Sequence, residues 1–334
     1  MQLDRDPMTG DSRPVPASSR RAPLVAALTR DGALPFAVLD GGLSTSLESL
    51  GERPAGALWT AQTLLERPHV VTAAHRLAVE AGADVVISAS YQASEDGFVA
   101  AGLERARART LLHGTTAIAR ASGARLVAAS VGPYGACRAD GSEYHGRYDV
   151  SWDDVRSFHR RRLEVLVDSG PDLVAIETVP TAAEASIVVE ELRRLSPVPA
   201  WVSFSCRDGW TTCGGDSMGA ALRAVDDGVE LVGVNCTAPA HVASLLEALT
   251  AARTSGGTGN PGPWVVYPNH GAAWDAEGKC WVGADGGREP AASASSWWDR
   301  GALLIGGCCG VGPSAIADLA RCRDAIAASR STDA

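Results

Sequence analysis

Eight short apolar runs recur along this chain of 334 residues, and they constrain its fold more than any other feature. The runs are rich in β-branched residues and near-continuous rather than alternating, which is typical of strands buried on both faces of a parallel sheet. They span residues 36–39, 84–90, 125–131, 173–176, 200–205, 231–234, 264–267 and 302–305. The sequence therefore predicts a buried parallel sheet.

Helical periodicity of apolar residues fills the intervals between the runs. It covers residues 68–81, 104–121, 152–168, 182–195, 216–227, 240–252 and 313–328. Alternating strands and helices imply βαβ units with right-handed crossovers. Eight such units predict an α/β fold with a single (βα)8 barrel of the TIM type. A doubly wound open sheet is the alternative, but no GxGxxG phosphate-binding fingerprint directly follows a predicted strand.

The predicted barrel places the carboxyl end of every strand on one face, where active sites of such barrels lie. Long loops follow three of the strands, at 132–151, 207–215 and 269–292, and we expect all three on that C-terminal face. Residues 31–330 are expected to form the barrel domain. Residues 1–30 are polar and contain Pro and Arg, so we expect a mobile N-terminal tail.

The composition excludes several classes of partner. Asp and Glu number 39 against 30 Lys and Arg, a formal net charge of −9, and without a basic run nucleic acid is excluded as the main partner. No apolar stretch approaches the roughly 18 residues of a membrane span, and the N-terminus lacks the apolar region of a secretory signal. We therefore expect a cytoplasmic protein that needs neither a membrane nor a protein partner.

Three cysteines follow predicted strands: Cys236 comes after the sixth, and Cys308 and Cys309 after the eighth. In a reducing compartment such cysteines are more often metal ligands or catalytic thiols than disulfides. Strands two apart in a barrel can face a common point, so three thiolates could hold one Zn²⁺ and leave a fourth position open, as in catalytic zinc sites. Buried apolar packing and a disulfide between the adjacent pair are the alternatives.

Two carboxylates also stand at strand ends, Asp40 after the first run and Glu177 after the fourth. They could be the acid and base of a glycosidase, bind a substrate ammonium group, or form structural salt bridges. Gly41 and Gly42 follow with backbone N–H groups that could hold a carboxylate, so an amino acid substrate fits this set. A glycosidase would leave the cysteines unexplained. His270, at the end of the seventh strand, is a further candidate.

Eight sequence segments from residue 39 to residue 310 carry a family resemblance. They are LDGGLSTSLE (39–48), ISASYQAS (87–94), SVGPYGA (130–136), ADGSEY (139–144), AIETVP (175–180), GVNCTAP (233–239), VVYPN (265–269) and LIGGCCG (304–310). The chain resembles the zinc-dependent homocysteine S-methyltransferases, especially their S-methylmethionine-dependent branch. The resemblance implies a homocysteine-binding (βα)8 barrel.

The resemblance also implies the site residues. The Zn²⁺ ligands, and through the metal the catalytic residues, would be Cys236, Cys308 and Cys309. The substrate-binding residues would be Asp40, Gly41, Gly42, Ser88, Tyr91, Glu177 and Asn235. Of these, the Asp40 segment and Glu177 would bind the amino acid end of homocysteine, whereas SYQAS and the loop 134–148 would shape the methyl-donor pocket.

The implied reaction transfers a methyl group from a sulfonium donor to zinc-bound homocysteine thiolate and gives methionine. S-methylmethionine is the expected donor, with S-adenosylmethionine possible, and an aromatic residue such as Tyr91 could hold the sulfonium. The alternatives are another donor such as betaine, selenohomocysteine as acceptor, or a non-catalytic zinc- or thiol-binding barrel. The branch usually reads YPNSGE where this chain reads YPNHGA, and Trp274 replaces a usual tyrosine. These changes, at His270, Ala272 and Trp274, bear on donor identity.

Overall fold

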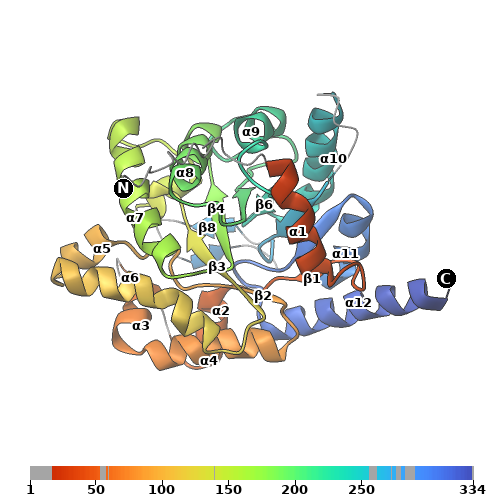
Figure 1. The fold of residues 1–334 in the computed structure, drawn as a ribbon, viewed down its shortest axis with the longest axis horizontal. Helices are drawn as coiled ribbons and strands as arrows, with labels where there is room; N and C mark the ends of the chain where they lie inside the picture. The colour runs from red at the N-terminus through yellow and green to blue at the C-terminus, as the bar shows by residue number, and fades with distance from the viewer. Residues whose placement is uncertain are drawn as a thin grey trace, which may run out of the picture.

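The structure is a computed structural model, and it describes residues 17–52, 58, 60–138, 140–255, 262–271, 273–275, 280–282 and 290–332. Eight strands form its central sheet, at the eight predicted positions. They are β1 (Ala37–Val38), β2 (Val85–Ile87), β3 (Leu126–Val131), β4 (Leu173–Val179), β5 (Ala200–Phe204), β6 (Leu231–Asn235), β7 (Trp264–Tyr267) and β10 (Ala302–Ile305). Figure 1 shows the strands at the centre with the helices packed around them.

The sheet closes on itself. Its strand order is β1-β10-β7-β6-β5-β4-β3-β2, and every neighbouring pair is parallel. The two ends of this order meet where Leu39 pairs with Val85 in a parallel bridge. Across the same seam, the Asp84 N–H donates to the Val38 carbonyl at 2.7 Å and the Asp40 N–H donates to the Val85 carbonyl at 3.1 Å. The predicted (βα)8 barrel is confirmed, and the open-sheet alternative is wrong.

All seven predicted helices are present. They are α4 (Pro68–Glu80), α6 (Arg105–Arg120), α7 (Trp152–Asp168), α8 (Ala182–Leu195), α9 (Met218–Val225), α10 (Pro239–Ser255) and α12 (Pro313–Thr332). The shorter α2 (Leu43–Ser49), α3 (Thr60–Glu66), α5 (Glu95–Ala100) and α11 (Pro290–Asp299) and the 3₁₀ turns η1 (Tyr134–Cys137) and η2 (Ser142–Tyr144) were not predicted. Local chemistry explains some boundaries: a capping box between Ser151 and Asp154 starts α7.

Alternate residues of each strand pack in two different directions, which explains why the strands are apolar throughout. In the first strand, Phe36 and Val38 join the cluster between the sheet and the helices. Ala37 and Leu39 instead join the cluster inside the barrel. Because both faces are buried, neither face retains a polar pattern.

The N-terminal segment differs from the prediction of a mobile tail over residues 1–30. Residues Ala17–Thr29 form helix α1, and residues 1–16 lie outside the described residues. Leu24 and Leu28, one helical turn apart, are buried in the cluster inside the barrel. Arg20 Nε donates to the Glu230 carboxylate at 2.5 Å. Apolar burial and a partly buried ion pair therefore anchor α1 on the barrel, and the polar composition of the segment concealed both.

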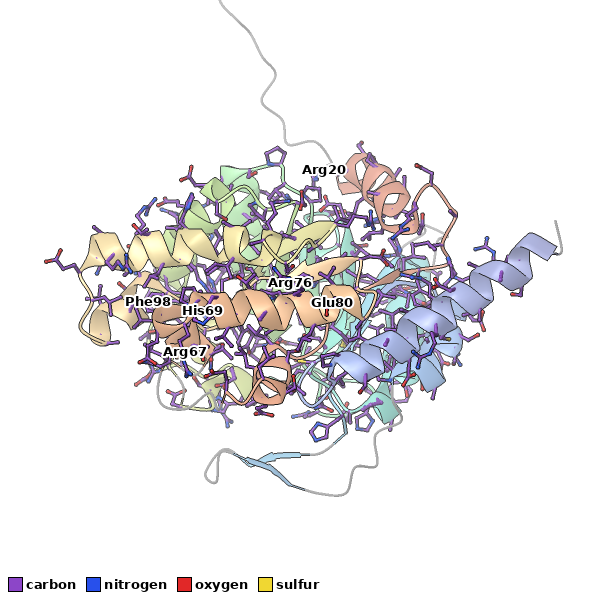
Figure 2. The ribbon with its side chains drawn as sticks, turned by 90° about the horizontal axis from the view of Figure 1, so that it is seen from below. Arg20, Arg67, His69, Arg76, Glu80 and Phe98 are labelled. Atoms are coloured by element: carbon purple, nitrogen blue, oxygen red, sulfur yellow. The ribbon has the colours of Figure 1, made fainter. Side chains whose placement is uncertain are left out.

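A hairpin occupies part of the predicted loop 269–292. Strands β8 (Ala273–Asp275) and β9 (Cys280–Val282) pair antiparallel outside the barrel sheet. Figure 2 shows this hairpin projecting from the end of the molecule opposite to α1, near which Arg20 is labelled. None of the helices in the described ranges combines the length and the apolar character that a bilayer crossing requires.

Candidate functional site

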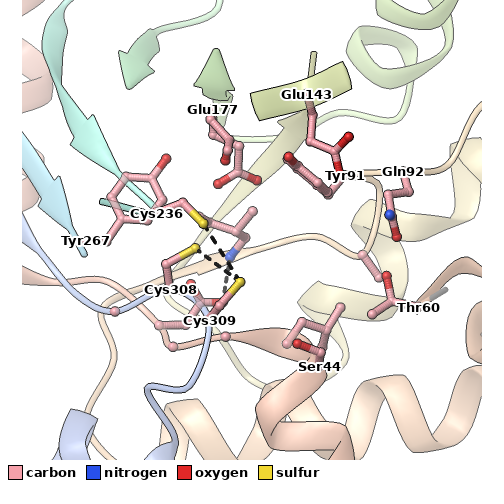
Figure 3. A pocket seen from close by; sticks show the side chains of 18 of the residues that line it. Ser44, Thr60, Tyr91, Gln92, Glu143, Glu177, Cys236, Tyr267, Cys308 and Cys309 are labelled. Carbon is pink, nitrogen blue, oxygen red and sulfur yellow. Dashed lines mark hydrogen bonds between the residues drawn. The ribbon is translucent and has the colours of Figure 1, made fainter. Parts of the chain in front are cut away.

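A cavity of about 290 Å³ opens at the carboxyl ends of the barrel strands. Nine of the ten predicted site residues line it, namely Asp40, Gly41, Gly42, Ser88, Tyr91, Glu177, Cys236, Cys308 and Cys309. They come from five different strand ends, and Figure 3 shows the side chains of Tyr91, Glu177 and the three cysteines converging on a common space. The barrel thus assembles one site from segments that are far apart in the sequence.

The three cysteine sulfurs form a compact triangle. Cys309 Sγ lies 3.9 Å from Cys236 Sγ and 3.9 Å from Cys308 Sγ, and all three atoms lie within 4.8 Å of one another. Tetrahedral zinc with Zn–S bonds of about 2.3 Å places its sulfur ligands roughly 3.8 Å apart. The spacing of these sulfurs therefore fits a zinc ion, and the cavity beside them leaves room for a fourth ligand.

The thiols influence one another's ionisation. Contacts with the other two sulfurs, followed by burial, raise the pKa of Cys236 well above its usual value. The same kind of contact holds the pKa of Cys309 well below its usual value, because its neighbours act as hydrogen-bond donors. Three adjoining thiolates would repel each other, and a divalent cation is the partner that lets all three ionise together.

Strand β7 holds the two cysteine segments in place. The Cys236 N–H donates to the Tyr267 carbonyl at 3.2 Å, and the Cys308 N–H donates to the Pro268 carbonyl at 2.8 Å. His270 packs behind them, since its N–H donates to the Cys309 carbonyl at 3.0 Å and its Nδ1 lies 3.1 Å from the same oxygen. His270 reaches the backbone of the cysteine loop but is not among the described residues that line the cavity.

Two residues at the site adopt a left-handed backbone that non-glycine residues rarely use: Thr178 with φ +60° and Cys236 with φ +48°. Asn235, fully buried between them, stabilises the first. Its Oδ1 accepts from the Thr178 N–H and its Nδ2 donates to Thr178 Oγ1, each at 2.8 Å. Asn235 thus shapes the wall through Thr178, and its side chain is not among the described groups that line the cavity.

Asp40 and Glu177 are both buried and line the cavity. The Asp40 carboxylate accepts from the Ile87 N–H at 2.9 Å, and Glu177 accepts from the Ser130 hydroxyl. Burial raises the pKa of Glu177 to about 7, although the hydrogen bond from Ser130 opposes it. Burial also raises the pKa of Asp40 well above its usual value. A cation in the cavity would favour the ionised form of both groups.

The turn at Gly41 and Gly42 packs directly against the cysteine loop, and the predicted contact with a substrate carboxylate stays a prediction for the Gly41 N–H. The Gly42 N–H donates to the Val311 carbonyl at 3.0 Å, so it is not available to a substrate carboxylate. A Cβ on Gly41 would lie 2.4 Å from the Val311 carbonyl oxygen, and one on Gly42 would lie 2.7 Å from that of Cys308. Glycine is therefore required here because the cysteine loop passes directly against this turn.

A buried arginine positions Tyr91. Arg162, on α7, donates to the carbonyl oxygens of Ser90, Tyr91 and Gly132, with distances of 2.6 Å to Tyr91 and 2.9 Å to Gly132. A Cβ on Gly132 would lie 2.6 Å from the Tyr91 ring, so glycine leaves space for that ring. Nearby, Ser88 Oγ is 2.8 Å from Ser90 Oγ. Hydrogen bonds from Arg162 to the backbone thus hold the segment that carries the Tyr91 ring.

Several lining residues were missed by the sequence reasoning as individual candidates: Thr60, Gln92, Glu143, Tyr144 and Tyr267. Gln92, Glu143 and Tyr144 lie in the ISASYQAS and ADGSEY segments, so the segments themselves were the available signal. Tyr267 was detectable as a hydroxyl-bearing residue inside an apolar run. Of the substitutions at 270–274, Ala272 lies outside the described residues, and Trp274 is described only as part of strand β8.

Known proteins are similar to this chain in sequence and in fold. A family-wide sequence model described as homocysteine S-methyltransferase matches residues 37–323. Homocysteine S-methyltransferase 4 of Zea mays is 42% identical over 309 residues, covering 85% of this chain and 88% of the maize protein. The selenocysteine Se-methyltransferase of Brassica oleracea var. italica is 37% identical over 307 residues, covering 84% and 87%. The metallated form of the homocysteine methyltransferase MmuM from Escherichia coli matches with 35% identity and a TM-score of 0.74, covering 86% of this chain and 96% of that one.

Replacing Asn235 with alanine should destabilise the site wall. The change Asn235→Ala removes two buried hydrogen bonds and leaves the Thr178 N–H unpaired, so we expect the free energy of unfolding to fall by about 2–4 kcal/mol. The substitution Thr178→Gly should lower the free energy of unfolding less in the Asn235→Ala variant than in the wild type, because glycine adopts positive φ without strain. Urea denaturation of the four proteins measures this coupling. Strictly additive losses would mean that Asn235 does not act through Thr178.

Proposed function

Because this chain belongs to the homocysteine S-methyltransferase family, we propose that it transfers a methyl group from a sulfonium donor to the sulfur of homocysteine, giving methionine. The observation that carries the proposal is the triangle of Cys236, Cys308 and Cys309 sulfurs beside two buried carboxylates in one cavity. The three thiols must stay reduced for this chemistry, so we propose a cytoplasmic location.

We propose Zn²⁺ as the metal of this site, with Cys236, Cys308 and Cys309 as its ligands, because their sulfur spacing fits tetrahedral zinc. Zinc held by three thiolates would lower the pKa of the homocysteine thiol, so that it reacts as a thiolate at neutral pH without a general base. The residues of the chain then have two tasks: they bind the amino acid end of homocysteine and align the donor.

Asp40 and Glu177 suit the first task. Both are buried, both face the cavity, and neither has a cationic side chain among the described residues that line it. The ammonium group of homocysteine would supply that charge through charge-assisted hydrogen bonds. We assign them to substrate binding rather than to the acid–base pair of a glycosidase, because a thiolate nucleophile needs no base and the cysteines then have a role.

In the transfer step, the homocysteine sulfur donates an electron pair to the methyl carbon as the bond from that carbon to the sulfonium sulfur breaks. The donor leaves as a neutral thioether, and with S-methylmethionine both products are methionine. The two sulfurs and the methyl carbon must lie in line, so positioning by the cavity wall is the main contribution of the protein. Tyr91, held by Arg162, offers a ring face to the sulfonium.

The name of one relative points to a second class of methyl acceptor, the selenium amino acids. The broccoli protein named selenocysteine Se-methyltransferase is 37% identical to this chain. A selenol also has a soft anionic form, and selenocysteine and selenohomocysteine carry the same ammonium and carboxylate groups as homocysteine. Comparing kcat/KM for homocysteine and for these selenium analogues with one donor decides between them. We expect homocysteine to be used, and a value for it far below those of the selenium compounds would favour the second acceptor class.

We expect one zinc ion per chain. Cys236→Ser and Cys308→Ser should each lose most of the zinc, because hydroxyl groups do not replace thiolates as zinc ligands, whereas Cys322→Ser on α12 should keep it. Metal analysis of the four purified proteins measures the stoichiometry. Full zinc retention in both site variants would exclude this site.

We expect Glu177→Gln to weaken homocysteine binding while zinc content stays normal. Loss of a charge-assisted hydrogen bond to ammonium should raise the homocysteine KM roughly 10- to 100-fold. The exposed carboxylate of Glu164, on α7, provides the control variant Glu164→Gln. An unchanged KM together with the loss of one limb of the kcat pH profile would assign proton transfer to Glu177 instead.

We expect S-methylmethionine to be a better donor than S-adenosylmethionine. The cavity of about 290 Å³ lies at the small end of the roughly 300–1,000 Å³ range of ligand pockets, and it must hold both substrates. An adenosyl group adds a whole nucleoside to the donor. Methionine formation by mass, with each donor and with betaine at saturating homocysteine, gives the kcat/KM values. A higher value for S-adenosylmethionine refutes the donor assignment, and no methionine from any donor refutes the proposed function.

A further inference from the structure

The cavity carries charge of one sign. Four carboxylate residues line it, Asp40, Asp140, Glu143 and Glu177, and the described lining includes no Lys, Arg or His. Such a cavity attracts cations. Asp40 and Glu177 stand at the carboxyl ends of β1 and β4, whereas Asp140 and Glu143 come from the loop that follows β3. The acidic groups therefore form two separate sets, and the acceptor proposed above accounts for only one of them.

Glu143 differs from the other three carboxylates in its hydrogen bonds. Its Oε2 is buried and has no hydrogen-bond partner among the described residues. Asp140, in the same loop, already pairs with Arg138 at 2.8 Å and accepts from the Ser142 N–H at 3.0 Å. A buried charged acceptor without a partner lowers the stability of the protein, so a hydrogen-bond donor from a bound ligand would be stabilised at this oxygen.

Aromatic rings flank this carboxylate on the cavity side. Figure 3 shows Glu143 beside Tyr91, and the charge of Glu143 contributes to raising the pKa of Tyr91, after burial as the main cause. Tyr144, adjacent in sequence, lines the same cavity as Cys236 and Cys309. A ligand with its ammonium group at Glu143 can therefore place a second cationic centre against these rings, toward the cysteines.

The chemistry of a sulfonium amino acid matches this arrangement. Its sulfonium centre has no N–H donor and can be held against the ring faces of the tyrosines by cation–π attraction. Its α-ammonium group has three N–H donors and can satisfy the unpaired Oε2. We propose that Glu143 binds the α-ammonium group of the methyl donor and thereby selects sulfonium donors that carry one. The inference rests on the proposed function, and it adds a specificity-determining residue to the donor half of the site.

Binding measurements with the zinc-loaded full chain test the proposal. The probes are S-methylmethionine and (2-carboxyethyl)dimethylsulfonium, which keeps the sulfonium and a carboxylate but lacks the ammonium group. Glu143→Gln preserves the size of the side chain and removes its charge, and Glu164→Gln is the control. We expect Glu143→Gln to weaken S-methylmethionine binding about 10- to 100-fold by calorimetry and to leave binding of the ammonium-free probe, zinc content and homocysteine KM unchanged.

Three results would overturn the proposal: unchanged S-methylmethionine binding by Glu143→Gln, an equal loss for both probes, or a rise in homocysteine KM instead. Because the first two results are direct binding measurements, they can be read even if the wild-type chain forms no methionine. If the wild-type chain forms no methionine with any of the donors, the proposed function is contradicted. A selective loss of S-methylmethionine affinity in Glu143→Gln would still support the ammonium site.

Discussion

The carboxyl end of strand β7 sets the geometry on which the site depends. This strand lies between β6 and β10, and its end accepts backbone hydrogen bonds from both cysteine segments. The Tyr267 carbonyl accepts from the Cys236 N–H, and the Pro268 carbonyl accepts from the Cys308 N–H. Neighbouring strands of a sheet have a nearly fixed spacing, so the backbone holds the two segments at a constant separation. The sulfur triangle is therefore a property of the sheet rather than of flexible side chains, and its dimensions suit a metal.

The site also contains strain and buried charge that the rest of the barrel must offset. Thr178 and Cys236 have positive φ, and such conformations persist only where the surroundings impose them. Asp40 and Glu177 are buried with raised pKa values, which reflects the cost of keeping them ionised away from water. A metal and a cationic substrate would relieve part of this cost, so ligands are expected to stabilise the fold as well as to react in it.

The sequence was most informative where one local rule decided the outcome. Continuous apolar runs predicted all eight strands, because burial on both faces leaves no polar positions, and strand ends predicted the convergence of Asp40, Glu177 and the cysteines. It was least informative where a residue acts through a distant partner. Helix α1 looked like a polar tail because its anchors, Leu24 and Leu28 and the ion pair of Arg20, make sense only against the barrel.

What the sequence determined by itself is the set of chemical groups and their order: the strands, the thiols and the carboxylates that follow them. Periodicity and strand-end position are local properties, so they can be read without knowing the fold. Only the tertiary structure decided which groups pair inside the barrel and which remain available. The Asn235 side chain is hydrogen-bonded to Thr178, and the Gly42 N–H is hydrogen-bonded to the Val311 carbonyl. Glu143 Oε2 has no partner among the described residues. Hydrogen-bond pairing depends on differences of a few tenths of an ångström in the separation of segments far apart in the chain, and no local pattern in the sequence encodes those separations.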